Sequence, residues 1–245
     1  MIMKEKHDLD YLIVPTGLTV MLAYHMWHLY RIVQHPNKTA IGINAINRRL
    51  WVQAMMEDSP KNGVLAVQTL RNNIMASTLL ASTVIMLSSL IALLMSSSSW
   101  EKSLYLVFGD RTELGFSIKF FSILVCLLFA FLLNLQSVKY YSHASILINV
   151  PFKKVSSSPH YHHLAAEHVA RTVNRGSYFW SLGLRAFYFS FPLFFWLFGP
   201  IPMLLSCFVL VFMLYFLDVT LEFGSAVACS DHDHRKDKVA LGMET

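Results

Sequence analysis

Long apolar runs, separated by basic segments, constrain the fold of this chain more than any other feature. Of its 245 residues, 55% are hydrophobic and 14% are charged, whereas a soluble domain carries about 25% charged residues. A helix crosses the hydrocarbon core of a bilayer with about 20 apolar residues. The sequence therefore predicts an all-α fold, a polytopic helical membrane protein with cytosolic helix extensions.

Five runs are long enough to span a membrane: residues 9–30, 73–95, 116–138, 177–198 and 201–221. The last two form one apolar region that is too long for a single span, and Gly199-Pro200-Ile201-Pro202 interrupts it near the middle. Because proline and glycine do not continue a helix cleanly, we expect a tight turn between two spans. One kinked or re-entrant segment is the alternative. All five spans belong to one domain, residues 1–224.

Basic residues are concentrated in the loops 31–72 and 139–176 and in the C-terminal tail. Such loops stay in the cytosol, so five spans place the N-terminus outside or in a lumen and the C-terminus in the cytosol. The expected location is the plasma membrane or an endomembrane, with membrane lipid around the spans. Residues 225–245 are predicted to be a disordered polar tail. Since the charges follow topology, no nucleic acid is expected as a partner.

Both cytosolic loops contain a Ser-Pro pair, Ser59-Pro60 and Ser158-Pro159. Serine before the first turn and proline within it are typical of a helix start. We therefore expect one helix from Pro60 to Met95 and another from Pro159 toward Phe198, with a local break at Gly176. Helices of this length would extend beyond the apolar slab of about 30 Å and form a cytosolic helical collar.

The stretch 43–55 has apolar residues at helical spacing, among them Ile46, Leu50 and Trp51. One interpretation is an interfacial helix on anionic lipid, with Arg48, Arg49 and Trp51 at the membrane surface. The other is a helix packed against the collar.

Small residues recur in the second span, where Ser77 and Ala81 are four residues apart. They favour close helix packing, and a hydrophilic pathway wall is the alternative.

Four short runs carry a resemblance to a known family: His35-Pro36, Asn47-Arg48-Arg49-Leu50-Trp51-Val52, Met55-Met56 and Gln68-Thr69-Leu70-Arg71-Asn72-Asn73. They resemble a plant membrane-protein family carried as a domain of unknown function (DUF family 599), over residues 10 to about 224. The resemblance implies a multi-span plant membrane protein and no established activity. No catalytic residue can be transferred from it.

Arg185 is a charge within the fourth span. Burying a charge in lipid costs about 2.5–3.5 kcal/mol or more, so the side chain needs protein or water around it. If the chain turns at residues 199–202, the antiparallel register brings Arg185 opposite Asp218. We therefore predict an intramembrane Arg185–Asp218 ion pair; an arginine that reaches the inner headgroups is the alternative.

A polar set lies at the inner mouth of the second span: Gln68, Arg71, Asn72 and Asn73, with Asn134 of the third span as a partner. These groups need partners near lipid. They predict either the vestibule of a pathway or a structural tie between the collar and the third and fourth spans.

Histidines gather on the predicted cytosolic side: His25, His28, His143, His160, His162, His163 and His168. Imidazole binds transition metals and titrates near neutral pH, so a metal centre, a haem pair or a pH sensor could be built from them. However, the spacing is not that of membrane di-iron enzymes, and ordinary interfacial histidines are the alternative. No metal site, cofactor or catalytic residue is assigned.

Three function classes follow. The first is a small channel or transporter for an ion or solute, acting as a homo-oligomer because five thin spans enclose little volume, with a basic cytosolic vestibule. The second is a membrane scaffold or regulatory protein that acts through its cytosolic collar. The third is a histidine-based metal or haem membrane enzyme.

Overall fold

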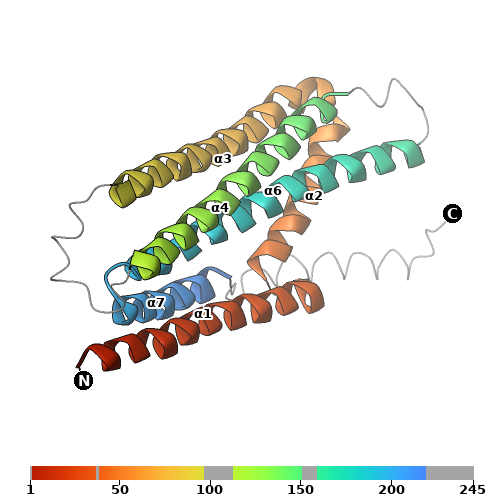
Figure 1. Ribbon diagram of the computed structural model, residues 1–245. Coiled ribbons are helices and arrows are strands. Elements are labelled where there is room, and N and C mark those ends of the chain that lie inside the picture. The colour runs from red at the N-terminus through yellow and green to blue at the C-terminus, as the bar shows by residue number, and fades with distance from the viewer. Residues whose placement is uncertain (1, 37–38, 97–112, 151–158, 219–245) are drawn as a thin grey trace.

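The computed structural model describes residues 2–36, 39–96, 113–150 and 159–218, and within these ranges the chain is helical, with no strand (Figure 1). The helices are α1 (Ile2–Gln34), α2 (Ala40–Glu57), α3 (Ser59–Ser96), α4 (Glu113–Leu147), α6 (Pro159–Phe195) and α7 (Pro200–Asp218). The predicted all-α fold is therefore confirmed. The predicted tail, residues 225–245, lies outside the described residues.

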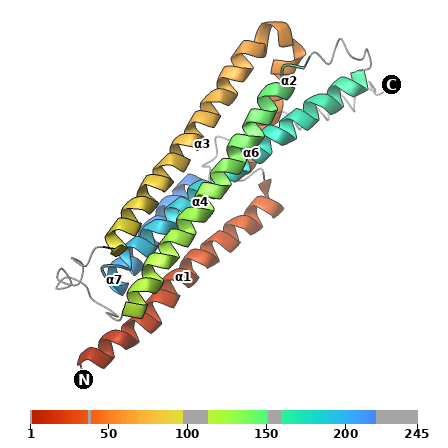
Figure 2. The ribbon, with the colours of Figure 1, turned by 45° about the horizontal axis from the view of Figure 1, so that its top comes forward.

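The long helices pack in the order α3, α4, α6, α7 and α1, each against the next. Figures 1 and 2 show α3 and α1 on opposite sides of this row. The shorter α2 lies across α6 and α3 and forms the collar with their ends. Consequently, α3 is an edge helix, with α4 on one side and no other long helix packed broadly against it among the described residues.

Four helical segments are long and apolar enough to cross a membrane: Asp10–Gln34, Ser59–Ser96, Glu113–Leu147 and Pro200–Asp218. They correspond to the predicted first, second, third and fifth spans; residues 219–221 of the fifth lie outside the described residues. The predicted fourth span lies in α6, which is less apolar because Arg185 and several Ser and Tyr residues interrupt this half of the helix. That this part of α6 crosses the membrane therefore stays a prediction.

The helix starts at the two Ser-Pro pairs are confirmed, since α3 begins at Ser59 and α6 at Pro159. With 38 residues in α3 and a rise of about 1.5 Å per residue, the helix is roughly 57 Å long. Similarly, α4 continues past residue 138 to Leu147. All three helices are thus longer than the apolar slab, as a collar requires.

The predicted break at Gly176 is wrong, because α6 passes through this residue without interruption. The glycine serves helix packing instead: a Cβ there would lie 3.1 Å from ring atoms of Tyr141 on α4. Its carbonyl also accepts a hydrogen bond of 2.9 Å from the Ser137 hydroxyl. The missing side chain therefore lets α4 and α6 approach closely.

The predicted turn between the last two spans is present. The α6 helix ends at Phe195 and α7 begins at Pro200. Between them, Gly199 has a φ of 143°, a backbone conformation that residues with a Cβ rarely adopt. The chain therefore reverses here, and α6 and α7 form a helical hairpin instead of one kinked helix.

Two apolar clusters hold the bundle together. The larger lies among the spans and includes Met21, Ile91, Leu127 and Met203, all nearly inaccessible. The smaller lies in the collar, where Val52 of α2 packs with Leu70 and Val169. Between α3 and α4, the small residues Ser77 and Ala81 are buried, and Ser77 and Ser137 are hydrogen-bonded at 3.1 Å.

We predict that Gly199→Ala lowers the free energy of unfolding by about 1–3 kcal/mol, because a Cβ is strained at this φ. Thermal unfolding of the purified protein in detergent measures the effect. Leu205→Ala is the control, since this side chain lies in the first turns of α7 and is 66% exposed. Equal stability of the two variants would contradict the turn geometry.

Candidate functional site

A buried polar network joins three helices near the described end of α7. Asp218 of α7 is 6% exposed and accepts a hydrogen bond of 2.6 Å from the Tyr24 hydroxyl of α1. Arg185 of α6 donates from Nη2 to the other oxygen of Asp218. His28 lies one turn from Tyr24, with Nδ1 3.6 Å from Asp218 and Nε2 3.1 Å from Arg185 Nη2.

The local sequence explains how these groups meet. Arg185 and Asp218 are 33 residues apart, and the hairpin at Gly199 turns the two helices antiparallel. On α1, Tyr24 and His28 have the i, i+4 spacing that places two side chains on one helix face. The structure thus brings together the two predicted partners and adds two α1 residues. The part of Tyr24 in this network was not predicted. Its i, i+4 spacing to His28 is the only local sequence feature that indicates it.

The network neutralises two charges inside an apolar bundle. Because attraction between opposite charges is stronger away from water, the pair is stable only while both partners are present. Nη1 of Arg185 is buried and has no hydrogen-bond partner among the described residues. The arrangement therefore ties α1 to the α6–α7 hairpin, and one guanidinium nitrogen remains available for a water molecule or a further acceptor.

The predicted vestibule set does not form a single cavity. Gln68, Arg71 and Asn72 are exposed on α3, whereas Asn73 is partly buried. Asn134 lies elsewhere: it is buried in α4, donates to the carbonyl of Ala130 at 2.7 Å and faces α6, where a Cβ on Gly183 would be 2.5 Å from it. Within the described residues, no hydrogen bond joins Asn134 to the four α3 residues.

The histidines are likewise dispersed. His28 belongs to the buried network, and His25 Nδ1 lies 2.7 Å from the carbonyl of Met21. His143 is exposed on α4, and the remaining ones occupy the first turns of α6, mostly exposed: His160, His162, His163 and His168. In the described part of the chain, no three His, Cys, Asp or Glu side chains come close enough to hold a metal ion.

The segment predicted to be an interfacial helix is α2, and it packs against the collar. Arg49 Nε is 2.6 Å from Glu167 of α6, which also pairs with Arg171 at 3.2 Å. Trp51 and Val52 contribute to the collar cluster. In contrast, Ile46 and Leu50 are 37% and 45% exposed. The structure thus has the packed arrangement and still leaves an apolar stripe on the outer face of α2.

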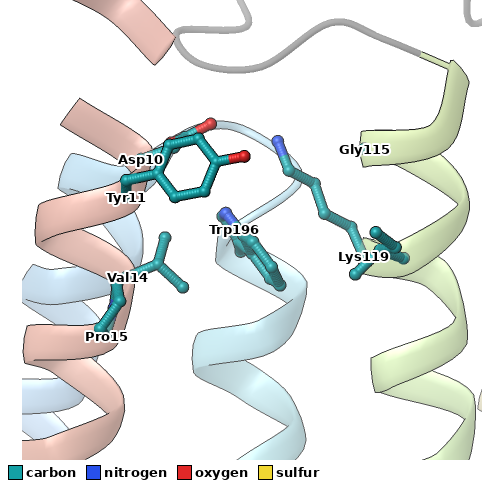
Figure 3. Close-up of a pocket in the computed structure, with 8 residues that line it drawn as sticks. Asp10, Tyr11, Val14, Pro15, Gly115, Lys119 and Trp196 are labelled. Carbon is teal, nitrogen blue, oxygen red and sulfur yellow. The ribbon is translucent and has the colours of Figure 1, made fainter. Parts of the chain in front are cut away.

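A second buried cation lies at the opposite end of the spans. Lys119 of α4 is 1% exposed, and its Nζ lies 5.6 Å and 5.5 Å from the ring centres of Phe116 and Trp196. A pocket of about 250 Å³ opens beside it, with Asp10, Tyr11 and Trp196 around the lysine (Figure 3). The burial of Lys119 was not predicted from the sequence. The sequence feature that could have indicated it is Phe116, one turn earlier, since aromatic faces attract cations.

Comparison with known proteins places residues 12–223 in the family described as "Protein of unknown function, DUF599". No curated protein matches, and no solved structure matches either. The match covers nearly all of the described helices. It agrees with the resemblance in the sequence and gives no activity; plant origin stays an expectation.

We predict that Asp218→Ala lowers the free energy of unfolding by about 3–5 kcal/mol, since it leaves Arg185 as an uncompensated buried charge. The double variant with Arg185→Ala should lose less than the sum of the two single losses. Thermal unfolding in detergent measures all three variants. Asp58→Ala is the control, because this carboxylate is exposed at the end of α2. Strictly additive losses would show that the two side chains do not interact.

Proposed function

This chain belongs to the DUF599 family of proteins of unknown function. We propose that it is a small homo-oligomeric channel or transporter whose pathway follows the outer face of α3. The proposal includes the predicted fourth span, residues 177–198, which makes five spans in all, with the N-terminus outside or in a lumen. Its main support is a polar stripe along a helix that is otherwise apolar enough to cross a membrane.

The stripe begins in the collar and continues through most of α3. Its members follow the three- and four-residue spacing of one helix face: Gln68, Arg71, Thr78, Ser82 and Ser89, all exposed. Met75 and Met86 lie between them and are 59% and 74% exposed. The opposite face of α3, with Ser77 and Ala81, packs on α4. The small polar residues of this span therefore divide into a packing face and an outward face.

An outward polar stripe is unfavourable against hydrocarbon, where polar groups lack partners. The Ser89 hydroxyl donates to the carbonyl of Ile85 at 3.0 Å. In contrast, Thr78 and Ser82 have no side-chain hydrogen bond within the described residues. A second copy with the same stripe, or water between two copies, would supply these partners. Because α3 is at the edge of the row, copies can meet there without displacing another helix.

The charge at the collar end favours anions. Arg71 is exposed at the start of the stripe, and no acidic residue lies on this face between Gln68 and Ser89. Inside a single chain, by contrast, the space between the spans is filled by the apolar cluster around Ile91 and Leu127. A pathway between subunits therefore fits this chain better than a pathway through one subunit.

A scaffold or regulatory role is the second candidate. Its support is the collar, where Glu167 pairs with two arginines and fixes α2 on α6. Such a surface could present a rigid shape to a cytosolic partner. The scaffold role requires no flux of ions or solutes across the membrane, and this distinguishes it from the channel or transporter.

We predict that the purified protein in liposomes conducts chloride above protein-free vesicles, and that Ser82→Leu reduces this flux to near the protein-free level. Leucine fills the stripe with an apolar side chain and removes the hydroxyl. A chloride-sensitive dye in the vesicles measures the rate.

Thr83→Leu is the matched control. Thr83 is the next residue of α3 and lies about 100° around the helix from Ser82, with its hydroxyl bonded to the carbonyl of Leu79 at 2.9 Å. Its flux should equal that of the unmodified protein. No flux from the unmodified protein to chloride, nitrate or potassium would leave the scaffold role as the better explanation.

A further inference from the structure

A second pocket, of about 280 Å³, lies in the collar between α2, α3 and α6. Its walls come from two segments that are separate in the sequence, one on α2 and one on α3, and from Val173 on α6. The lining residues are Asn44, Asn47, Arg48, Trp51, Thr69, Asn73 and Val173. Except for Asn44, the lining residues of α2 and α3 belong to two of the runs by which the sequence resembles its family, and the fold joins these runs at one cavity.

The pocket is rich in hydrogen-bond donors and contains no acidic residue. Three asparagines each present a carboxamide, and within the described residues none of the three side chains makes a hydrogen bond. The Thr69 hydroxyl donates to the carbonyl of Leu65 at 3.0 Å. One guanidinium and several amide N–H groups therefore face a space that lacks a negative charge.

Arg48 is held in place by a relay of hydrogen bonds. Its Nε donates to Asn174 Oδ1 at 2.8 Å, and Asn174 Nδ2 donates to the carbonyl of Ala45 at 3.2 Å. No carboxylate of the described residues lies within ion-pair distance of Arg48, whereas neighbouring Arg49 is paired with Glu167. Burial also lowers the pKa of Arg48, which reflects the cost of desolvating an uncompensated charge. An anion in the pocket would reduce this cost.

The pocket lies where α3 enters the predicted apolar slab. Thr69 and Asn73 are the polar residues of its wall on α3, and Asn73 is the first residue of the predicted second span, 73–95. Trp51 contributes an aromatic side chain at the same level, as is common where protein meets headgroups. On the predicted topology, the cavity therefore lies at the height of the phosphate groups of the cytosolic leaflet.

We propose that this pocket binds a phosphate-bearing anion, supplied by the headgroup of an anionic phospholipid of the cytosolic leaflet. The two free guanidinium nitrogens of Arg48 donate to phosphate oxygens, as paired N–H groups of arginine do. The carboxamides of Asn47 and Asn73 complete the donor set. The lipid tails extend along the exposed apolar residues at the start of the second span.

The full-length protein, purified in detergent, is titrated calorimetrically with short-chain phosphatidic acid. The expected result is saturable binding, which Arg48→Gln weakens by about tenfold or more, as expected for the loss of a charged hydrogen-bond donor. Asn73→Leu is a second pocket variant with the same expectation and leaves Arg48 in place. Circular dichroism shows that each variant is folded before the titration.

Lys139→Gln is the matched control, because it removes an exposed cation of α4 outside the pocket; its affinity should equal that of the unmodified protein. Diacylglycerol with the same acyl chains should not bind, since it lacks the phosphate. The pocket assignment is overturned if phosphatidic acid does not saturate, or if Lys139→Gln weakens binding as much as Arg48→Gln. If inorganic phosphate binds as tightly as phosphatidic acid, the claim that the bound phosphate belongs to a lipid headgroup is overturned.

Discussion

Charged groups inside an apolar bundle need partners from the protein itself, and this requirement shapes the packing of the spans. Arg185 meets Asp218, and the same carboxylate takes hydrogen bonds or close contacts from Tyr24 and His28 of α1. At the other end, the Lys119 ammonium lies near the aromatic rings of Phe116 and Trp196. Between these two points the helices pack mainly through the larger apolar cluster, with a few polar contacts such as the Ser77–Ser137 hydrogen bond. The buried charges therefore add specificity to packing that is otherwise largely apolar.

The sequence predicts most of the fold, because helix starts and turns depend on local chemistry. The Ser-Pro pairs and Gly199 act through their own backbone preferences, and the structure has a helix start or a turn at each of them. Gly176 has the same local signal as a helix breaker, but its role is set by Tyr141 on another helix. Sequence alone does not reveal such a contact.

The buried network around Arg185 and Asp218 could be predicted only in part from the sequence. A hairpin of known turn fixes the register of its two helices, so the contact between Arg185 and Asp218 followed from counting residues. The contribution of α1 depends on packing between segments 194 residues apart. The vestibule set failed to assemble for a geometric reason: successive residues of a helix point about 100° apart, so Gln68, Arg71, Asn72 and Asn73 cannot all face one cavity.

The order of synthesis determines when the Arg185–Asp218 ion pair can form. The ribosome produces Arg185 33 residues before Asp218, and Tyr24 and His28 are made long before either of them. If α6 crosses the bilayer, as we propose, its arginine lacks the Asp218 carboxylate during this interval, so α6 is a poor candidate for independent insertion. Helix α7 then supplies the counter-ion and draws α6 and α1 together. A nascent chain released before α7 would therefore lack the residue that completes its assembly.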